Sequence, residues 1–131
     1  MSSAPAQPTE RQVQRAILQM CGALFPDVYL HHSPNGAFLG SARDKAIRGG
    51  ALKGDGTKAG FPDLICLWSG GAAFMEIKRP KNSSVSDEQK ACHERLTSLG
   101  WPVAIIKTPE AAHAFLVKCG APCRGSAGGV L

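Results

Sequence analysis

Apolar residues recur at helical spacing in three segments of the chain and form short continuous runs in four others. In the first segment Thr9 begins a capping-box pattern, and apolar residues follow at positions 13, 17, 18, 21 and 24, which predicts a helix over residues 10–25. Capping signals at Ser86 and Thr108 predict two further helices, over residues 86–99 and from 109 to about 119.

The four apolar runs are bounded by turn residues and predict strands over residues 28–31, 64–68, 73–78 and 103–106. Ser69-Gly70-Gly71 forms a tight turn between the second and third strands, so these two should pair antiparallel. The helix between the third and fourth strands is a crossover, which implies a parallel pair. We therefore predict an α/β fold, a small mixed β-sheet flanked by helices in the order α-β-β-β-α-β-α. Residues 1–8 are expected to be disordered and residues 120–131 to form a loose tail, which leaves one domain over residues 9–119.

Two acids and a lysine on neighbouring predicted strands are the strongest chemical signal. Asp63 begins one strand, and Glu76 and Lys78 share a face of the next, because strand side chains alternate between faces. The residues around Glu76 are apolar, so the pair should lie near the sheet interior, where a charge is costly unless it is paired or binds a metal. This set suits a divalent cation and an anionic substrate. The alternative is a structural role, in which Asp63 is a turn residue and Glu76 and Lys78 are a solvated pair on an edge strand. The protein would then be a structural or interaction protein whose acids and lysines form only salt bridges.

Composition narrows the class of partner. The chain has 131 residues, enough for one hydrophobic core, and a net charge of +5, which favours a polyanionic partner. No apolar run approaches the length that spans a bilayer, and no secretory signal opens the chain, so we expect a cytoplasmic protein of a bacterium or a phage-infected host, without a membrane partner. Of the five cysteines, Cys21, Cys66 and Cys92 are expected to be reduced core residues, and Cys119 and Cys123 to be incidental.

The basic residues gather in two places. One group lies at positions 43–58, within a glycine-rich connection over residues 36–60 that is long enough to suggest a functional loop, and the other adjoins the suspected site. A solvated basic face is the alternative interpretation. The members of the two groups are Arg43, Lys45, Arg48, Lys53 and Lys58, and then Lys78, Arg79 and Lys81.

These motifs together resemble a known family. Gly60-Phe61-Pro62-Asp63, a hairpin, Glu76-Ile77-Lys78-Arg79-Pro80 and then Ser86-Asp87-Glu88-Gln89 are similar to the VRR-NUC (virus-type replication-repair nuclease) branch of the PD-(D/E)XK nucleases. The resemblance extends from about Glu10 to Thr108. It implies a restriction-endonuclease-like core and metal-dependent hydrolysis of phosphodiester bonds, without an organic cofactor.

The resemblance also implies roles for individual residues. Asp63 and Glu76, with the backbone carbonyl of Ile77, would bind Mg²⁺ or Mn²⁺, which prefer oxygen ligands. Lys78 would position the attacking water, help deprotonate it or neutralise charge on the phosphate, and these alternatives stay open. Gln89 is implied as a site residue in addition to its capping role. Glu10 is a possible further ligand, although an acid in the first turn of a helix also stabilises the helix through its dipole.

A second set of residues is implied to contact DNA, and here the phosphate contacts should make binding strongly salt-dependent. Histidines 31 and 32 resemble part of a segment that approaches the site, but a histidine at a strand end is more often structural. The histidines at positions 93 and 113 are assigned no role. The residues expected at the DNA are Asn35, Arg43, Arg48, Lys53, Lys58, Arg79 and Lys81.

Family members that consist of the nuclease domain alone resemble Holliday-junction resolvases that act as homodimers. A two-fold dimer suits symmetric incision of a four-way junction. The alternatives are a flap or nicking nuclease in phage or bacterial replication and repair, and a non-catalytic DNA-binding module. The intact set of Asp63, Glu76 and Lys78 argues against the last of these.

Overall fold

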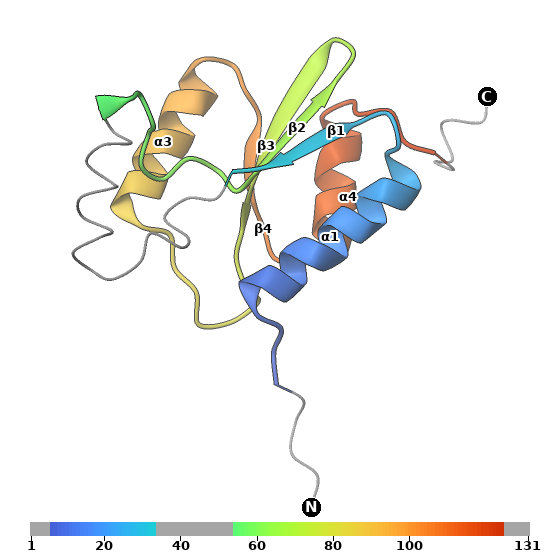
Figure 1. Cartoon of the computed structure of the whole chain (residues 1–131), viewed down its shortest axis with the longest axis horizontal. Helices are drawn as coiled ribbons and strands as arrows, with labels where there is room; N and C mark the ends of the chain where they lie inside the picture. Colours follow the sequence, from blue (N-terminus) through green and yellow to red (C-terminus); the bar gives the residue numbers. More distant parts are fainter. Residues whose placement is uncertain (1–5, 34–53, 125–131) are drawn as a thin grey trace, which may run out of the picture.

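A computed structural model of the chain describes residues 6–33 and 54–124, which form one sheet with helices on both faces (Figure 1). The element order agrees with the predicted α-β-β-β-α-β-α. Among the described residues, no helix is long and apolar enough to cross a membrane. The elements are α1 (Glu10–Leu24), β1 (Tyr29–His32), β2 (Leu64–Trp68), β3 (Gly71–Ile77), α3 (Asp87–Ser98), β4 (Val103–Ile106) and α4 (Pro109–Lys118).

The strands lie in the order β1-β2-β3-β4. The pairs β1–β2 and β2–β3 are antiparallel and the pair β3–β4 is parallel, which confirms the predicted mixed sheet. β3 begins earlier than expected, at Gly71, because Gly71 already pairs with Trp68 across the hairpin. A Cβ at position 71 would collide with the indole ring of Trp68, so any other residue there would force that ring to move.

The three helices begin where their capping signals predict. The hydroxyl of Thr9 accepts a hydrogen bond from the backbone N–H of Gln12, whose side chain in turn accepts from the N–H of Thr9. Ser86 and Gln89 form the same reciprocal pair at the start of α3. At α4 the hydroxyl of Thr108 accepts from a backbone N–H, and a proline fills the first helical position.

The main hydrophobic core of the described residues lies on one face of the sheet. Helices α1 and α4 pack against that face and each other, and alternate residues of β3, Ala73, Met75 and Ile77, point into the core between them. α3 lies on the opposite face (Figure 1) and has no buried residue. The even-numbered side chains of β3, including Glu76, therefore face α3.

The cysteines divide between these two faces. Cys21 and Cys66 are free and fully buried in the core, as predicted, and burial raises the pKa of Cys21 to about 11 and of Cys66 to about 12. Both thiols are therefore protonated and unreactive near neutral pH. Cys92 differs from the prediction: it is free but only half-buried, because α3 sends no side chain into the core.

Candidate active site

Asp63 is held at the junction of three segments immediately before β2. Its backbone carbonyl accepts a hydrogen bond of 2.7 Å from the N–H of Ser33, just after β1. Its side-chain Oδ2 accepts a hydrogen bond of 2.8 Å from the backbone N–H of Ile77, at the end of β3. The carboxylate is thus fixed against the neighbouring strand, as the sequence predicted for two acids on adjacent strands.

Glu76 is the most deeply buried charged residue in the described part of the chain, with 1% of its surface exposed. Both of its carboxyl oxygens have a partner on α3. Gln89 donates from Nε2 to Oε2 over 3.1 Å, and Nε2 of His93 lies 3.3 Å from Oε1. Gln89 and His93 are four residues apart, so they lie on the same face of the helix.

The two carboxyl groups lie close enough to perturb each other. The pKa of Glu76 is raised to about 9, first by burial and then by a hydrogen bond to the side chain of Asp63 and by the negative charge of Asp63, whereas the positive charge of Lys78 opposes this. Glu10 contributes a smaller repulsion, which places it within electrostatic range of Glu76. Two adjacent acids that repel each other in a partly dry site are arranged to share a proton or a cation.

His93 is held in its neutral form by the same surroundings. Burial lowers its pKa, and Lys78 lowers it further while Asp63 acts in the opposite direction. A neutral imidazole has one N–H, so Nε2 donates to Oε1 of Glu76 in the tautomer that carries the proton on Nε2 and accepts from a protonated Glu76 in the other tautomer.

Lys78 follows β3 directly and lies on the same face as Glu76 by strand alternation, as predicted. Its exposed fraction is only 8%, and its backbone N–H donates to the carbonyl of Ile106 on β4. The influence of its charge on both Glu76 and His93 places the ammonium group within the site.

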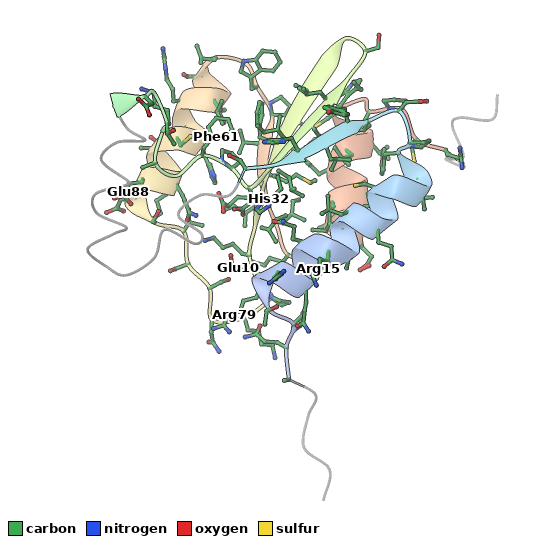
Figure 2. All side chains as sticks on the ribbon, in the orientation of Figure 1. Glu10, Arg15, His32, Phe61, Arg79 and Glu88 are labelled. Atoms are coloured by element: carbon green, nitrogen blue, oxygen red, sulfur yellow. The ribbon has the colours of Figure 1, made fainter. Side chains whose placement is uncertain are left out.

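Gly60 explains how α3 reaches the site. Its φ is +78°, a conformation that favours glycine, and a side chain here would collide with the backbone of Glu88 and Gln89 in the first turn of α3. The segment that leads to Asp63 therefore passes directly over the start of the helix that supports Glu76. Figure 2 shows Phe61 beside this crossing, and its ring stacks edge-on against Phe74 of β3 with ring centres 5.8 Å apart.

The donors present fit a hard divalent cation. Asp63 and Glu76 supply carboxylate oxygens, which suit Mg²⁺ or Mn²⁺ rather than a soft metal. The thiol of Cys92 lies within electrostatic range of Glu76, and burial together with the charge of Glu76 raises its pKa, which keeps it protonated. In residues 6–33 and 54–124 no group of three or more His, Cys, Asp or Glu side chains could hold a metal ion. An ion here would therefore depend on two carboxylates, a backbone carbonyl and water, the sparse protein ligation that Mg²⁺ commonly has.

The predicted DNA-contacting residues are only partly within the described structure. Arg79 and Lys81 lie in the loop that follows Lys78, and Lys58 is exposed two residues before Gly60. His31 and His32 are exposed on β1, and Figure 2 shows His32 near the centre of the view. Four residues of the set lie outside the described residues, namely Asn35, Arg43, Arg48 and Lys53.

His93 is the site residue that sequence reasoning missed. The available signal was its spacing: it is four positions after Gln89, so a helix that brings Gln89 to Glu76 must bring His93 to the same face. No local pattern in the sequence shows how closely α3 approaches Glu76, because that distance depends on a tertiary contact, the packing of Gly60 against the first turn of α3.

The sheet order and the placement of Asp63, Glu76 and Lys78 are consistent with an α/β nuclease core. The VRR-NUC domain profile matches residues 8–109, most of the chain, and the chain therefore belongs to the VRR-NUC family. Among solved structures it is similar to a VRR_NUC domain protein, with a TM-score of 0.67 and 24% identity over 87% of this chain and 89% of the other, a likeness in fold. No curated protein matches it.

Family membership supplies the broad function. A VRR-NUC domain implies a nuclease-type activity, and a nuclease domain implies DNA as the substrate.

Proposed function

We propose that this protein is a metal-dependent DNA endonuclease whose reaction occurs at Asp63, Glu76 and Lys78. The observation that supports this most directly is the forced proximity of two carboxyl groups, one of them almost fully buried, beside a buried lysine. A fold gains no stability from such repulsion, and perturbed acids gathered in this way are typical of functional sites.

Asp63 and Glu76 would hold Mg²⁺ or Mn²⁺ together with the carbonyl of Ile77, whose N–H already faces Asp63. An extended residue directs its N–H and carbonyl toward the same neighbouring strand, which supports this use of Ile77. Such an ion would lower the pKa of a bound water and would stabilise negative charge on the scissile phosphate. Glu10 lies within electrostatic range of Glu76 and is proposed as a possible further ligand of the ion.

The remaining residues position the groups that react. Gln89 and His93 fix both oxygens of Glu76 by hydrogen bonds, and each oxygen keeps a lone pair for a ligand. Lys78 is buried beside Glu76, and its ammonium group would orient the attacking water and offset charge on the phosphate. Replacing Lys78 by Met keeps the bulk and removes the charge, so it should abolish cleavage and spare DNA binding.

For the substrate we propose a four-way DNA junction, cut by a homodimer. The exposed side chains of Tyr29 and Leu67 support a second copy of the chain as partner, because they face each other across the β1–β2 pair with 76% and 44% of their surfaces exposed. An apolar sheet face of this kind suits association of two equal subunits.

The test is cleavage of labelled four-way junction, flap, nicked and linear duplex DNA with Mg²⁺ or Mn²⁺, with EDTA and Glu76→Ala as controls. Paired symmetric cuts in the junction, lost in both controls, are expected. Preferential cutting of flaps or nicks would replace the resolvase by a flap or nicking nuclease and keep the site. Binding without cleavage under every metal would indicate a non-catalytic DNA-binding module and overturn the proposed reaction.

A further inference from the structure

Gln7 makes two hydrogen bonds with the backbone of a residue 74 positions later. Its side-chain oxygen accepts from the N–H of Lys81 over 2.8 Å, and its side-chain nitrogen donates to the carbonyl of Lys81 over 3.0 Å. The sequence predicts disorder over residues 1–8, yet within that segment Gln7 has this specific contact. It ties the chain that leads into α1 to the loop that leaves the proposed active site.

That loop, residues 79–84, is also organised from within. The guanidinium of Arg79 donates to the carbonyl of Asn82 over 3.2 Å, and the hydroxyl of Ser83 donates to the carbonyl of Arg79 over 2.9 Å. Asn82 has a φ of 55°, a conformation that asparagine tolerates better than most residues and that turns the chain back. The loop has no apolar core, so these polar contacts and Gln7 define its shape.

The helix that Gln7 leads into adds two arginines to this end of the molecule. Arg11 and Arg15 are exposed and four residues apart, so they lie on the same outward face of α1, about 6 Å apart along the helix axis. Figure 2 shows Arg15, Glu10 and Arg79 at the same end of the molecule, around the N-terminal half of α1.

The charge of this surface is not balanced by nearby acids. Apart from Glu10, which adjoins the proposed metal site, α1 contains no acidic residue. Over residues 6–33 and 54–124 no salt bridge involves a lysine or an arginine, and the contact between His93 and Glu76 joins a histidine in its neutral form to an acid. Four cations therefore face solvent or backbone beside a proposed nuclease site, in an arrangement that salt bridges do not account for.

We propose that Arg11, Arg15, Arg79 and Lys81 form a phosphate-binding surface, here called the α1–loop surface, which holds a duplex arm of the DNA as it leaves the active site. Gln7 is a positioning residue, because its hydrogen bonds to Lys81 hold the loop that carries Arg79 and Lys81 against the start of α1. The inference rests on the proposed function and deepens it, because it assigns the direction in which the substrate extends from the catalytic centre.

The experiment measures binding of the full-length protein to labelled duplex and junction DNA in EDTA, by fluorescence anisotropy at several salt concentrations. The double variant Arg11→Gln, Arg15→Gln should weaken binding about tenfold and reduce the slope of log affinity against log salt by about 2, since each duplex phosphate contact contributes about 0.9. Gln7→Ala should weaken binding by roughly threefold and lower the slope by about 1 through the loss of an ordered Lys81 and Arg79.

Matched controls remove equal charge or an equal side chain elsewhere. Arg95→Gln, Lys118→Gln deletes two exposed cations in the last turns of α3 and α4, which lie toward the end of the sheet away from the site. Gln19→Ala removes an exposed glutamine of α1. Both should leave the salt slope close to that of the wild type. Circular dichroism and thermal melting establish that each variant is folded.

The two hypotheses fail in different ways. If the wild type binds and cleaves DNA while the Arg11, Arg15 variant has the same salt slope as the Arg95, Lys118 control, the α1–loop surface is overturned and the nuclease proposal stands. If the wild type neither binds nor cleaves DNA, both are overturned. If Gln7→Ala matches Gln19→Ala while the double arginine variant has a lower slope, the surface is kept and the positioning role of Gln7 is wrong.

Discussion

The two faces of β3 differ in what holds them in place. On one face Ala73, Met75 and Ile77 are enclosed by α1 and α4 in a continuous apolar core. On the other face Glu76 is held by hydrogen bonds from a helix with no buried residue. Both sets of side chains are buried, but the first set is apolar throughout, whereas on the second face the carboxyl group of Glu76 is buried beside Phe74. Burial on the first face stabilises the fold, whereas burial on the second face also fixes the carboxyl group that we propose takes part in the reaction.

The largest effects should come from neighbouring substitutions on opposite faces. Met75→Ala removes a fully buried side chain and should destabilise the fold by about 2–5 kcal/mol. Glu76→Gln should lower the rate of cleavage about a thousandfold or more, about 4 kcal/mol of transition-state stabilisation, and should raise the melting temperature of the metal-free protein. Thermal denaturation in EDTA and single-turnover cleavage with Mn²⁺ measure the two effects.

The stabilisation by Glu76→Gln should depend on pH. The pKa of Glu76 is raised from its ordinary value to about 9, so the folded protein retains a proton that the unfolded chain releases. Stability from this group therefore falls as pH rises from about 4.5 to about 9, and removing the carboxyl should help more at pH 8 than at pH 5. Equal gains at both pH values would contradict the raised pKa of Glu76, which burial causes first and Asp63 second.

Gly60 packs against the first turn of α3, and a comparison with Gly56 isolates the role of this contact. Gly60→Ala imposes a positive φ on alanine and a collision with the first turn of α3, so it should cost about 2–4 kcal/mol and reduce cleavage. Gly56 also has a positive φ, +102°, but a Cβ added there would have no other atom within 4 Å. Gly56→Ala should cost only about 1–2 kcal/mol. Similar losses in urea denaturation would mean that the contact with α3 is unimportant.

His93 should affect metal binding more than stability. His93→Leu removes the hydrogen-bond partner of Oε1 of Glu76, and the loss of a group that orients a metal ligand typically weakens metal binding by about 10–100-fold. Isothermal titration with Mn²⁺ measures this directly, apart from cleavage. His93→Gln, which keeps a donor, should recover part of the affinity. An unchanged Mn²⁺ affinity in His93→Leu would limit the contact to packing.

The apolar face was predictable from sequence almost in full, since local patterns determine it. The apolar run of β3, the helical periodicity of α1 and the capping box at Thr9 each predict their own element, and the structure confirms them. The parallel pairing of β3 with β4 also follows from the crossover between them.

The polar face was predictable in its residues but not in its contacts. Asp63, Glu76 and Lys78 stand out by their spacing, whereas His93 enters the site only through the close approach of α3 at Gly60. The contact between Gln7 and Lys81 joins residues 74 positions apart and leaves no periodic signal. Long-range polar contacts of this kind depend on tertiary geometry, and no local pattern encodes them. The roles of the site residues remain predictions.

The smallest expected effect is a difference in cleavage rate between variants that remove the capping hydroxyl of α1 and that of α3. Ser86→Ala and Thr9→Ala each remove one hydroxyl that caps a helix, and each should cost about 1 kcal/mol. The consequences for cleavage should differ. In α1 the core residues still hold the helix, so Thr9→Ala should leave the rate within about twofold of the wild type. In α3 the capping partner of Ser86 is Gln89 itself, so Ser86→Ala should loosen the contact between Gln89 and Glu76 and slow cleavage by roughly fivefold, the factor that about 1 kcal/mol supplies. Equal cleavage rates in the two variants would mean that α3 needs no more than its own packing to hold Glu76.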